Sequence, residues 1–269
     1  MFETKTVILT GASSGLGAVL AEAFARRGAN LALFARNEDG LRETEARCQK
    51  QGARCLVVVG DVTQPADCER LVVQTVSEFG GVDYLVSNAG ASMWARFEDV
   101  EDVSIFRKLM ETNYLGTVHC VHYVLPHLKQ RQGMVVAISS IQGKIGVPLH
   151  TGYVASKHAV QGFFEALRIE LDGSGVDVLT VLPHWLRGTK LRQNAYGKDG
   201  DRLGETSKRH SKESISLEDC SRAILKAMAK RKRELIIPFK LRFLPWLHLI
   251  HPKIVSWLVK GKVKTEDEW

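Results

Sequence analysis

The sequence predicts a doubly wound α/β domain, with a parallel sheet of about seven strands and helices on both of its faces. Short, almost continuously apolar runs rich in Val, Ile and Leu alternate along the chain with longer segments of helical periodicity. Unbroken apolar runs are typical of strands that are covered on both faces of a parallel sheet. In such a sheet the ligand crevice lies beyond the carboxyl ends of the strands, so polar residues there are the first candidates for function.

Glycine and proline mark where several of these elements begin and end. The first apolar run, KTVILTG, ends in Gly11, the helix after it closes at Gly28, and the third helix starts at Pro65. Either Ser216 or Asp219 caps the last helix of the domain. We expect strands at 5–11, 30–36, 54–62, 82–90, 133–140, 176–183 and 233–239. We expect helices at 15–29, 38–52, 65–81, 151–173 and 216–232, and either one long helix or two consecutive helices at 103–131.

The predicted strands and helices indicate one domain followed by a C-terminal extension. We expect a single domain over residues 1–238 and a basic, hydrophobic extension over residues 239–269. The segment 184–216 is polar and contains several glycines, which is the composition of a mobile lid over a substrate. A solvent loop without a gating role would have the same composition. No composition break or internal repeat indicates a second domain.

Composition places the chain among ordinary globular proteins. It has 269 residues, of which 45% are hydrophobic and 25% charged, and this excludes disorder as its main state. The net charge is +7, but the segment 226–264 holds eleven Lys or Arg and one acid, a local charge of +10 that leaves −3 elsewhere. The basicity is therefore a property of the C-terminal part, and it does not indicate a nucleic-acid partner.

The cysteines and the N-terminus indicate a reducing compartment. Five cysteines occur without a C-x-x-C pair or a Cys/His cluster, which predicts reduced thiols and no metal site. The first strand-like run begins close to Met1, and no basic segment with a long apolar run precedes it. We therefore expect a cytoplasmic protein.

A glycine-rich turn joins the first strand to the first helix. The stretch TGASSGLG at 10–17 places Gly11, Gly15 and Gly17 in a G-x-x-x-G-x-G spacing. Glycine lets backbone N–H groups approach an anion, and a helix N-terminus favours negative charge. At the first strand–helix junction this pattern indicates a pyrophosphate site, although an ordinary glycine-rich turn can show the same spacing.

The end of the second strand indicates which dinucleotide would bind. An acidic residue there would hold the ribose hydroxyls of NAD, but this chain has Ala35 followed by Arg36. A guanidinium suits the 2′-phosphate of NADP, and the hydroxyls of Ser13 and Ser14 would add donors. We therefore favour NADP(H) over NAD(H). In the alternative interpretation Arg36 is a solvated loop charge.

Tyr153 and Lys157 lie four residues apart on one face of a predicted helix. An unperturbed phenol has a pKa of about 10, and a neighbouring ammonium lowers that pKa toward the range useful for proton transfer. A lone pair of this kind also occurs by chance on surface helices. Two further features support it: Ser140 ends the fifth strand, and Asn88–Gly90 ends the fourth strand at the same edge of the sheet.

Taken together, these residues resemble the short-chain dehydrogenase/reductase family, whose fold is of the Rossmann type. The resemblance is carried by TGASSGLG at 10–17, Asp61–Val62, NAG at 88–90, Asn113, Ser140, and Tyr153 with Lys157. It covers residues 5–237, which is most of the chain. The family implies an oxidoreductase in which a nicotinamide cofactor carries the hydride.

The family pattern also implies a role for each matching residue. Tyr153 would be the general acid/base, Lys157 would lower its pKa and hold the nicotinamide ribose, and Ser140 would stabilise charge on the substrate oxygen. Asn113 would hold a water that joins Lys157 to solvent. The cofactor would be bound by Gly11, Ser13, Ser14, Gly15, Leu16, Gly17, Arg36, Asp61, Val62, Asn88, Ala89, Gly90, Tyr153, Lys157, Pro183, Leu186 and Thr189.

After the sixth strand the chain departs from the family pattern. His184 stands where the family usually has Gly, and Thr189 comes one residue later than the family threonine. We expect His184 and Trp185 to add bulk beside the nicotinamide and to reshape the substrate pocket. The imidazoles of His150, His158 and His184 are interpreted as solvated or satisfied groups rather than as bases.

We expect an NADP(H)-dependent enzyme that interconverts a carbonyl and a secondary alcohol on a hydrophobic, steroid-, retinoid- or lipid-like substrate. Met93, Trp94, Trp185 and the oily tail favour this substrate class. The alternatives are an NAD-dependent alcohol dehydrogenase of the same fold and a non-catalytic nucleotide-binding or membrane-associated scaffold. The family further implies a homodimer or homotetramer formed through the long helices at 113–131 and 151–172.

The extension at 239–269 is oily, basic and interrupted by prolines. Its longest stretch without Lys, Arg, Asp or Glu is 243–252, far shorter than the ~20 residues that span a bilayer. Pro245 and Pro252 would bound short helices with one apolar face. That face would consist of Leu244, Leu247, Ile250, Ile254, Trp257 and Leu258. It could rest on anionic lipid at the cytoplasmic face of a membrane, or it could pack on the substrate cleft or on a partner subunit.

Overall fold

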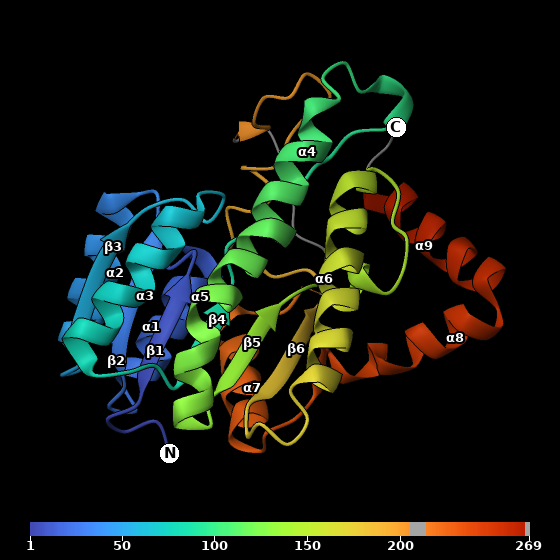
Figure 1. The fold of residues 1–269 in the computed structure, drawn as a ribbon. Helices are drawn as coiled ribbons and strands as arrows, with labels where there is room; N and C mark the ends of the chain where they lie inside the picture. Colours follow the sequence, from blue (N-terminus) through green and yellow to red (C-terminus); the bar gives the residue numbers. More distant parts are fainter. Residues whose placement is uncertain (205–213, 267–269) are drawn as a thin grey trace.

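One sheet of seven parallel strands, in the order β3-β2-β1-β4-β5-β6-β7, forms the centre of the molecule (Figure 1). This arrangement is seen in a computed structural model that describes residues 1–204 and 214–266. The strands are β1 (Thr6–Thr10), β2 (Asn30–Ala35), β3 (Cys55–Val59), β4 (Tyr84–Ser87), β5 (Met134–Ile138), β6 (Asp177–Pro183) and β7 (Glu234–Ile237). The predicted doubly wound parallel sheet is confirmed.

Helices cover both faces of this sheet. One layer is made by α1 (Gly15–Ala25), α2 (Glu38–Gln49) and α7 (Leu217–Ala229), and the other by α3 (Pro65–Phe79), α5 (Gly116–Arg131) and α6 (Thr151–Glu170). Successive strand residues point to opposite faces. In β1, Val7 and Leu9 therefore pack in the first layer, while Ile8 packs in the second. Burial on both faces explains why the central strands are almost continuously apolar, whereas the edge strands β3 and β7 are only partly buried.

The order of the strands creates a crevice between β1 and β4. The chain builds β2 and β3 on one side of β1 and then returns to place β4 on the other side. The connections after β1 and β4 therefore diverge, and a ligand site opens beyond the carboxyl ends of these two strands. The glycine-rich turn follows β1 at this edge, and Asn88 follows β4.

The segment 103–131 is an almost continuous helix with one irregular turn. α4 (Ser104–Met110) runs through a π-helical turn, η2 (Glu111–Leu115), into α5. The sequence left open whether there were one or two helices; the π turn is what separates them. Such turns widen a helix by one residue and are frequent at functional sites. This one contains the buried Asn113.

Part of the predicted lid is tied to the rest of the domain. The Tyr196 amide donates to the Ser92 carbonyl over 2.9 Å, and the Glu101 amide donates to the Lys198 carbonyl over 2.9 Å. Lys198 Nζ also lies 2.7 Å from a Glu101 carboxylate oxygen. These bonds hold 196–198 against 92–101, beside the short helix η1 (Phe97–Asp99). Residues 205–213 of the predicted lid lie outside the described residues.

The C-terminal extension forms η5 (Phe239–Phe243), α8 (Leu244–Ile250) and α9 (Pro252–Glu266). Pro245 lies in the first turn of α8 and Pro252 starts α9, as the sequence predicted. In Figure 1 both helices lie at the outer edge of the molecule, beyond α6. Among the helices that the structure describes, none combines the length and the apolar character that crossing a membrane requires.

The prediction of a single apolar face on this extension is wrong. Leu244 and Leu247 pack inward, with Val255 and Val259, against Ile141 and Ile145 beside η3 (Ile141–Gly143). The predicted partners Ile250, Ile254, Trp257 and Leu258 are exposed instead. The chain leaves helical geometry at His251, with φ −134° and ψ 68°, so the apolar stripe of α8 does not continue in register along α9.

Candidate active site

The glycine-rich turn leaves the N-terminus of α1 open toward the crevice. Gly11 and Gly15 have φ angles of +65° and +55°, which glycine adopts without strain. At Gly17 an added Cβ would lie 2.1 Å from the Gly11 carbonyl oxygen, so no larger residue fits. Ser14 precedes the helix, but its side chain makes no capping hydrogen bond. The first-turn N–H groups are therefore available to an anion.

Asn88 ties the glycine-rich turn to the end of β4. Its side-chain amide donates to the carbonyl oxygens of Thr10 (3.0 Å) and Gly11 (3.3 Å). In return, the Thr10 hydroxyl accepts hydrogen bonds from the backbone amides of Asn88 (2.9 Å) and Ala89 (3.0 Å). These four bonds join residues almost eighty positions apart and fix both sides of the crevice.

Arg36 lies at the far end of the crevice, after β2. Its guanidinium is 3.4 Å from a carboxylate oxygen of Asp61, and its side chain is 67% exposed. An ion pair this exposed contributes little to stability. The guanidinium is therefore held near the site by a weak contact and is accessible to a ligand.

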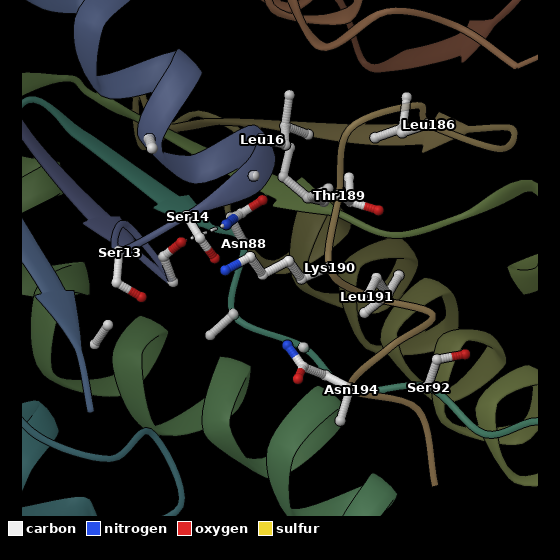
Figure 2. A pocket seen from close by; sticks show the side chains of 18 of the residues that line it. Ser13, Ser14, Leu16, Asn88, Ser92, Leu186, Thr189, Lys190, Leu191 and Asn194 are labelled. Carbon is white, nitrogen blue, oxygen red and sulfur yellow. Dashed lines mark hydrogen bonds between the residues drawn. The ribbon is translucent and has the colours of Figure 1, made fainter. Parts of the chain in front are cut away.

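A cavity of about 1080 Å³ joins these features to α6. Figure 2 shows Ser13, Ser14 and Asn88 on one side of it and Leu186 and Thr189 on the other. Of the predicted site residues, the following line the cavity: Gly11, Ser13, Ser14, Gly15, Leu16, Arg36, Asp61, Val62, Asn88, Ala89, Gly90, Ser140, Tyr153, Lys157, Pro183, Leu186 and Thr189. Gly17 and Asn113 do not line the cavity; both are buried, and the Asn113 side chain is hydrogen-bonded to the Ala91 amide, next to Gly90.

Ser140, Tyr153 and Lys157 meet at the carboxyl end of β5. The Ser140 hydroxyl oxygen accepts a hydrogen bond from the Gln142 amide over 3.2 Å, which leaves the hydroxyl proton free to be donated. Lys157 Nζ donates to the Ile138 carbonyl over 3.1 Å and lies 5.6 Å from the centre of the Tyr153 ring. A phenol, a hydroxyl and an ammonium thus converge on one region of the cavity.

Asn113 braces this group from behind. Its side-chain oxygen accepts from the Ala91 amide (2.8 Å), and its side-chain nitrogen donates to the Ala91 carbonyl (2.9 Å) and to the Ser156 hydroxyl (2.8 Å). A Cβ added at Gly90 would lie 3.1 Å from the Asn113 side-chain oxygen and 3.7 Å from Lys157 Nζ. Asn113 and Lys157 therefore approach each other across a glycine that leaves room for both.

Comparison with known proteins gives the same picture over most of the chain. A family model described as short chain dehydrogenase matches residues 5–199. This chain belongs to the short-chain dehydrogenase family. Its members are oxidoreductases on a nucleotide-binding fold of this type, and the resemblance seen in the sequence is confirmed.

Individual relatives of this short-chain dehydrogenase carry steroid and alcohol dehydrogenase names. A protein of Arabidopsis thaliana called 11-beta-hydroxysteroid dehydrogenase-like 4A is 38% identical over 255 residues, covering 93% of this chain and 82% of the relative. An 11-beta-hydroxysteroid dehydrogenase of Pinus massoniana is 33% identical, covering 95% and 73%. The solved alcohol dehydrogenase from the archaeon Thermococcus sibiricus, complexed with 5-hydroxy-NADP, superposes with a TM-score of 0.74 at 26% identity, covering 87% and 95%.

Burial dominates the electrostatics of the dehydrogenase site. It raises the pKa of Tyr153 to about 12, and the Ser140 hydroxyl opposes that rise only in part. It lowers the pKa of Lys157 to about 8. The expected lowering of the Tyr153 pKa is therefore not seen in this structure. The reason is that desolvation disfavours the charged form of both groups.

An aromatic wall stands next to Tyr153. The His150 ring lies 4.7 Å from Trp94, 5.7 Å from Trp185 and 6.3 Å from Tyr153, measured between ring centres. His150 Nδ1 is 2.8 Å from the Pro148 carbonyl, so this nitrogen carries the proton. Burial lowers the pKa of His150 to about 4, which keeps the ring neutral. His150 is thus a neutral imidazole whose Nδ1–H is hydrogen-bonded, and not a base, as the sequence predicted.

Two expectations about the substrate side need adjustment. Trp94, His184 and Trp185 line the cavity, but Met93 is fully buried and instead accepts a hydrogen bond from the Gly152 amide, at 3.1 Å from its sulfur. Apart from placing 184–216 in a predicted lid, the sequence gave no individual role to several cavity residues that come from the segment after β6 or follow Ser140. They are Gln142, Lys190, Leu191, Arg192, Asn194 and Arg202. Neither a sequence motif nor a periodic pattern identifies them as cavity residues, because they reach the cavity through the irregular course of connecting segments.

The buried Lys157 predicts a specific pH dependence of stability. The unfolded chain keeps the lysine proton up to the ordinary pKa of 10.5, whereas the folded chain releases it near 8, so over this interval the unfolded state binds more protons. The free energy of unfolding should therefore rise by about 2 kcal/mol between about pH 7 and pH 9.5 on account of this group. Urea unfolding of the wild type and Lys157→Met at both pH values measures this difference.

Lys50→Met, an exposed lysine in the structure, is the matched control for that measurement. It should leave the pH dependence of the wild type unchanged. An identical pH dependence in Lys157→Met and the wild type would contradict the assigned pKa.

Proposed function

We propose that this dehydrogenase uses NADP(H) to interconvert a carbonyl and a secondary alcohol on a hydrophobic substrate, with Tyr153 as the general acid/base. The observation that carries the proposal is the convergence of Ser140, Tyr153 and Lys157 at a cavity that also reaches the glycine-rich turn. The nicotinamide would supply the hydride. The start of α1 fits a pyrophosphate, because the Ser14 side chain makes no capping bond to its first N–H groups. Gly11 and Gly17 let the turn pack this closely, since an added Cβ would lie 2.9 Å and 2.8 Å, respectively, from the Asn88 side-chain nitrogen.

Each polar group has a distinct task in this proposal. The Ser140 hydroxyl, oriented by the Gln142 amide, would donate a hydrogen bond to the substrate oxygen. Tyr153 would give its proton to that oxygen during reduction or take the proton during oxidation. Lys157, held by the Ile138 carbonyl, would compensate negative charge on the Tyr153 oxygen. The role implied for Asn113 is a water-mediated connection from Lys157 to solvent.

The lining of the cavity near Tyr153 supports an apolar substrate. Trp94, His150 and Trp185 form an aromatic wall, and the Arg192 guanidinium stacks on it at 3.9 Å from the centre of the Trp94 ring. His150 itself is neutral, so its ring presents no charge to an apolar substrate. Within the described residues the buried side-chain oxygen of Gln142 has no hydrogen-bond partner, so it is a candidate acceptor for a substrate hydroxyl. Steroid dehydrogenase names among the relatives support a substrate of this class.

Two observations support NADP(H) over NAD(H). The residue after β2, Arg36, is an exposed arginine whose ion pair with Asp61 is long, at 3.4 Å, and weakly stabilising. The Thermococcus relative was solved with an NADP derivative. A guanidinium at this place would bind a 2′-phosphate through charge-assisted hydrogen bonds.

Replacing Tyr153 by Phe should lower turnover by about 100-fold or more, because loss of a general acid/base typically costs that much. The measurement is NADPH consumption with a panel of apolar ketones. Tyr84→Phe removes the same atom from a buried tyrosine in β4, away from the cavity, and should keep full activity. Full turnover in Tyr153→Phe would rule out the mechanism, and absence of turnover in the wild type would favour a non-catalytic nucleotide-binding protein.

Arg36→Asp should weaken NADPH binding by about 10- to 100-fold, the value of a hydrogen bond to a charged group, and should shift preference to NADH. Fluorescence titration with each cofactor measures this without any substrate. Arg42→Asp makes the same charge change at an exposed residue of α2 that does not line the cavity, and it should bind NADPH normally. Equal NADPH affinity in Arg36→Asp and wild type would remove Arg36 from the site.

We also propose that the enzyme assembles as a homodimer or homotetramer through α5 and α6. Tyr114 of η2 and Phe163 of α6 pack together at 6.1 Å between ring centres. Leu115, at the end of η2 before α5, and Ile169 of α6 are exposed. Sedimentation should give a mass of two or four 29.9 kDa chains. A single-chain mass at micromolar concentration would contradict this.

A further inference from the structure

The C-terminal extension exposes an unusual number of large apolar side chains. They are Phe239, Phe243, Trp246, Leu249, Ile250, Ile254, Trp257 and Leu258. These eight, within twenty residues, make up half of the exposed large apolar side chains found in the described part of the chain. Trp246 and Trp257 are 67% and 73% exposed, although tryptophan has a large apolar area to bury. Large apolar side chains exposed in such numbers on one short segment indicate an interaction surface.

The opposite side of the same extension holds it firmly on the domain. Val255 is 2% exposed and packs with Ile141 and Ile145, and Leu244 and Leu247 pack against the same cluster. The exposed side chains therefore belong to anchored helices and form a fixed outer face. We call the eight exposed side chains listed above the outer face.

Basic side chains lie among the residues of the outer face. The segment 239–261 contains Lys240, Arg242, Lys253 and Lys260 and no Asp or Glu. All four basic residues are exposed. The Arg242 guanidinium lies 4.8 Å from the centre of the Phe239 ring and 5.9 Å from that of Phe243, so charge and apolar surface share one side. Aromatic and basic residues in this mixture are typical of helices that lie in the interface of a lipid layer.

We propose that the outer face rests on an anionic membrane surface, with α8 and α9 lying in the plane of the headgroups. The positive charge favours an anionic membrane over a second copy of the chain. Two copies that met through this face would place the four basic residues of one copy against the four of the other, and these charges repel. Trp246 and Trp257 would insert at headgroup depth, where tryptophan is favoured. Ile141, which follows Ser140, lies in the cluster beneath these helices, so the lipid surface would be next to the substrate side of the cavity.

Flotation of the full-length protein with vesicles tests the proposal independently of enzyme activity. We expect the wild type to float with phosphatidylcholine vesicles that contain phosphatidylserine and to stay in solution with phosphatidylcholine alone or at high salt. Arg242→Glu/Lys253→Glu should lower the bound fraction by about tenfold or more. Trp246→Glu/Trp257→Glu should abolish flotation.

Two control variants separate this surface from general effects of charge. Val73→Glu places the same side chain at a 61% exposed position on α3, and Arg42→Glu reverses a charge on α2. Both should float like the wild type, and thermal unfolding should show that all variants are folded. Equal flotation of the wild type and the tail variants, or no flotation of the wild type, would overturn the proposal. So would a tryptophan double variant that dissociates an oligomer while vesicle binding is unchanged, since a second copy would then cover the face.

Discussion

The contact between the glycine-rich turn and the end of β4 is the constraint on which the site depends. Gly17 approaches the Gly11 carbonyl so closely that no side chain fits between them, and Asn88 bonds to the backbone of both Thr10 and Gly11. Close approach and hydrogen bonding therefore act together. They hold the N-terminus of α1 at the crevice, where the Ser14 side chain makes no capping bond to its first N–H groups.

Burial sets the chemistry on the other side of the cavity. Tyr153 and Lys157 are both removed from solvent, and desolvation disfavours the phenolate and the ammonium alike. The Ile138 carbonyl and the Ser140 hydroxyl are the polar groups that offset this cost. Asn113 keeps the surrounding backbone in place through three hydrogen bonds from a π turn. The result is a small polar group enclosed by apolar and aromatic walls, which is the form of most small-molecule sites.

The C-terminal extension shows how one short segment can serve two surfaces. Because the chain bends at His251, the apolar residues of α8 and α9 divide between an inner cluster and an outer face. The inner cluster joins the extension to the loop that follows Ser140. A partner that binds the outer face would therefore lie next to the substrate side of the active site, with only the inner cluster between them.

The sequence by itself determined the fold class, the order of strands and helices and the identity of the glycine-rich turn, because these depend on local periodicity and on residues with restricted conformations. Tyr153 with Lys157 and the strand ends at Asn88 and Ser140 were also visible, since each lies at a predictable place on its own element. Only the tertiary structure decided the pKa directions, the burial of Met93, the aromatic wall around His150 and the loop residues such as Lys190. Those features depend on which distant segments meet and on how much water they exclude. For the same reason the division of the tail into an inner and an outer face could not be read from its sequence, because a single bend at His251 changed which side chains face the domain.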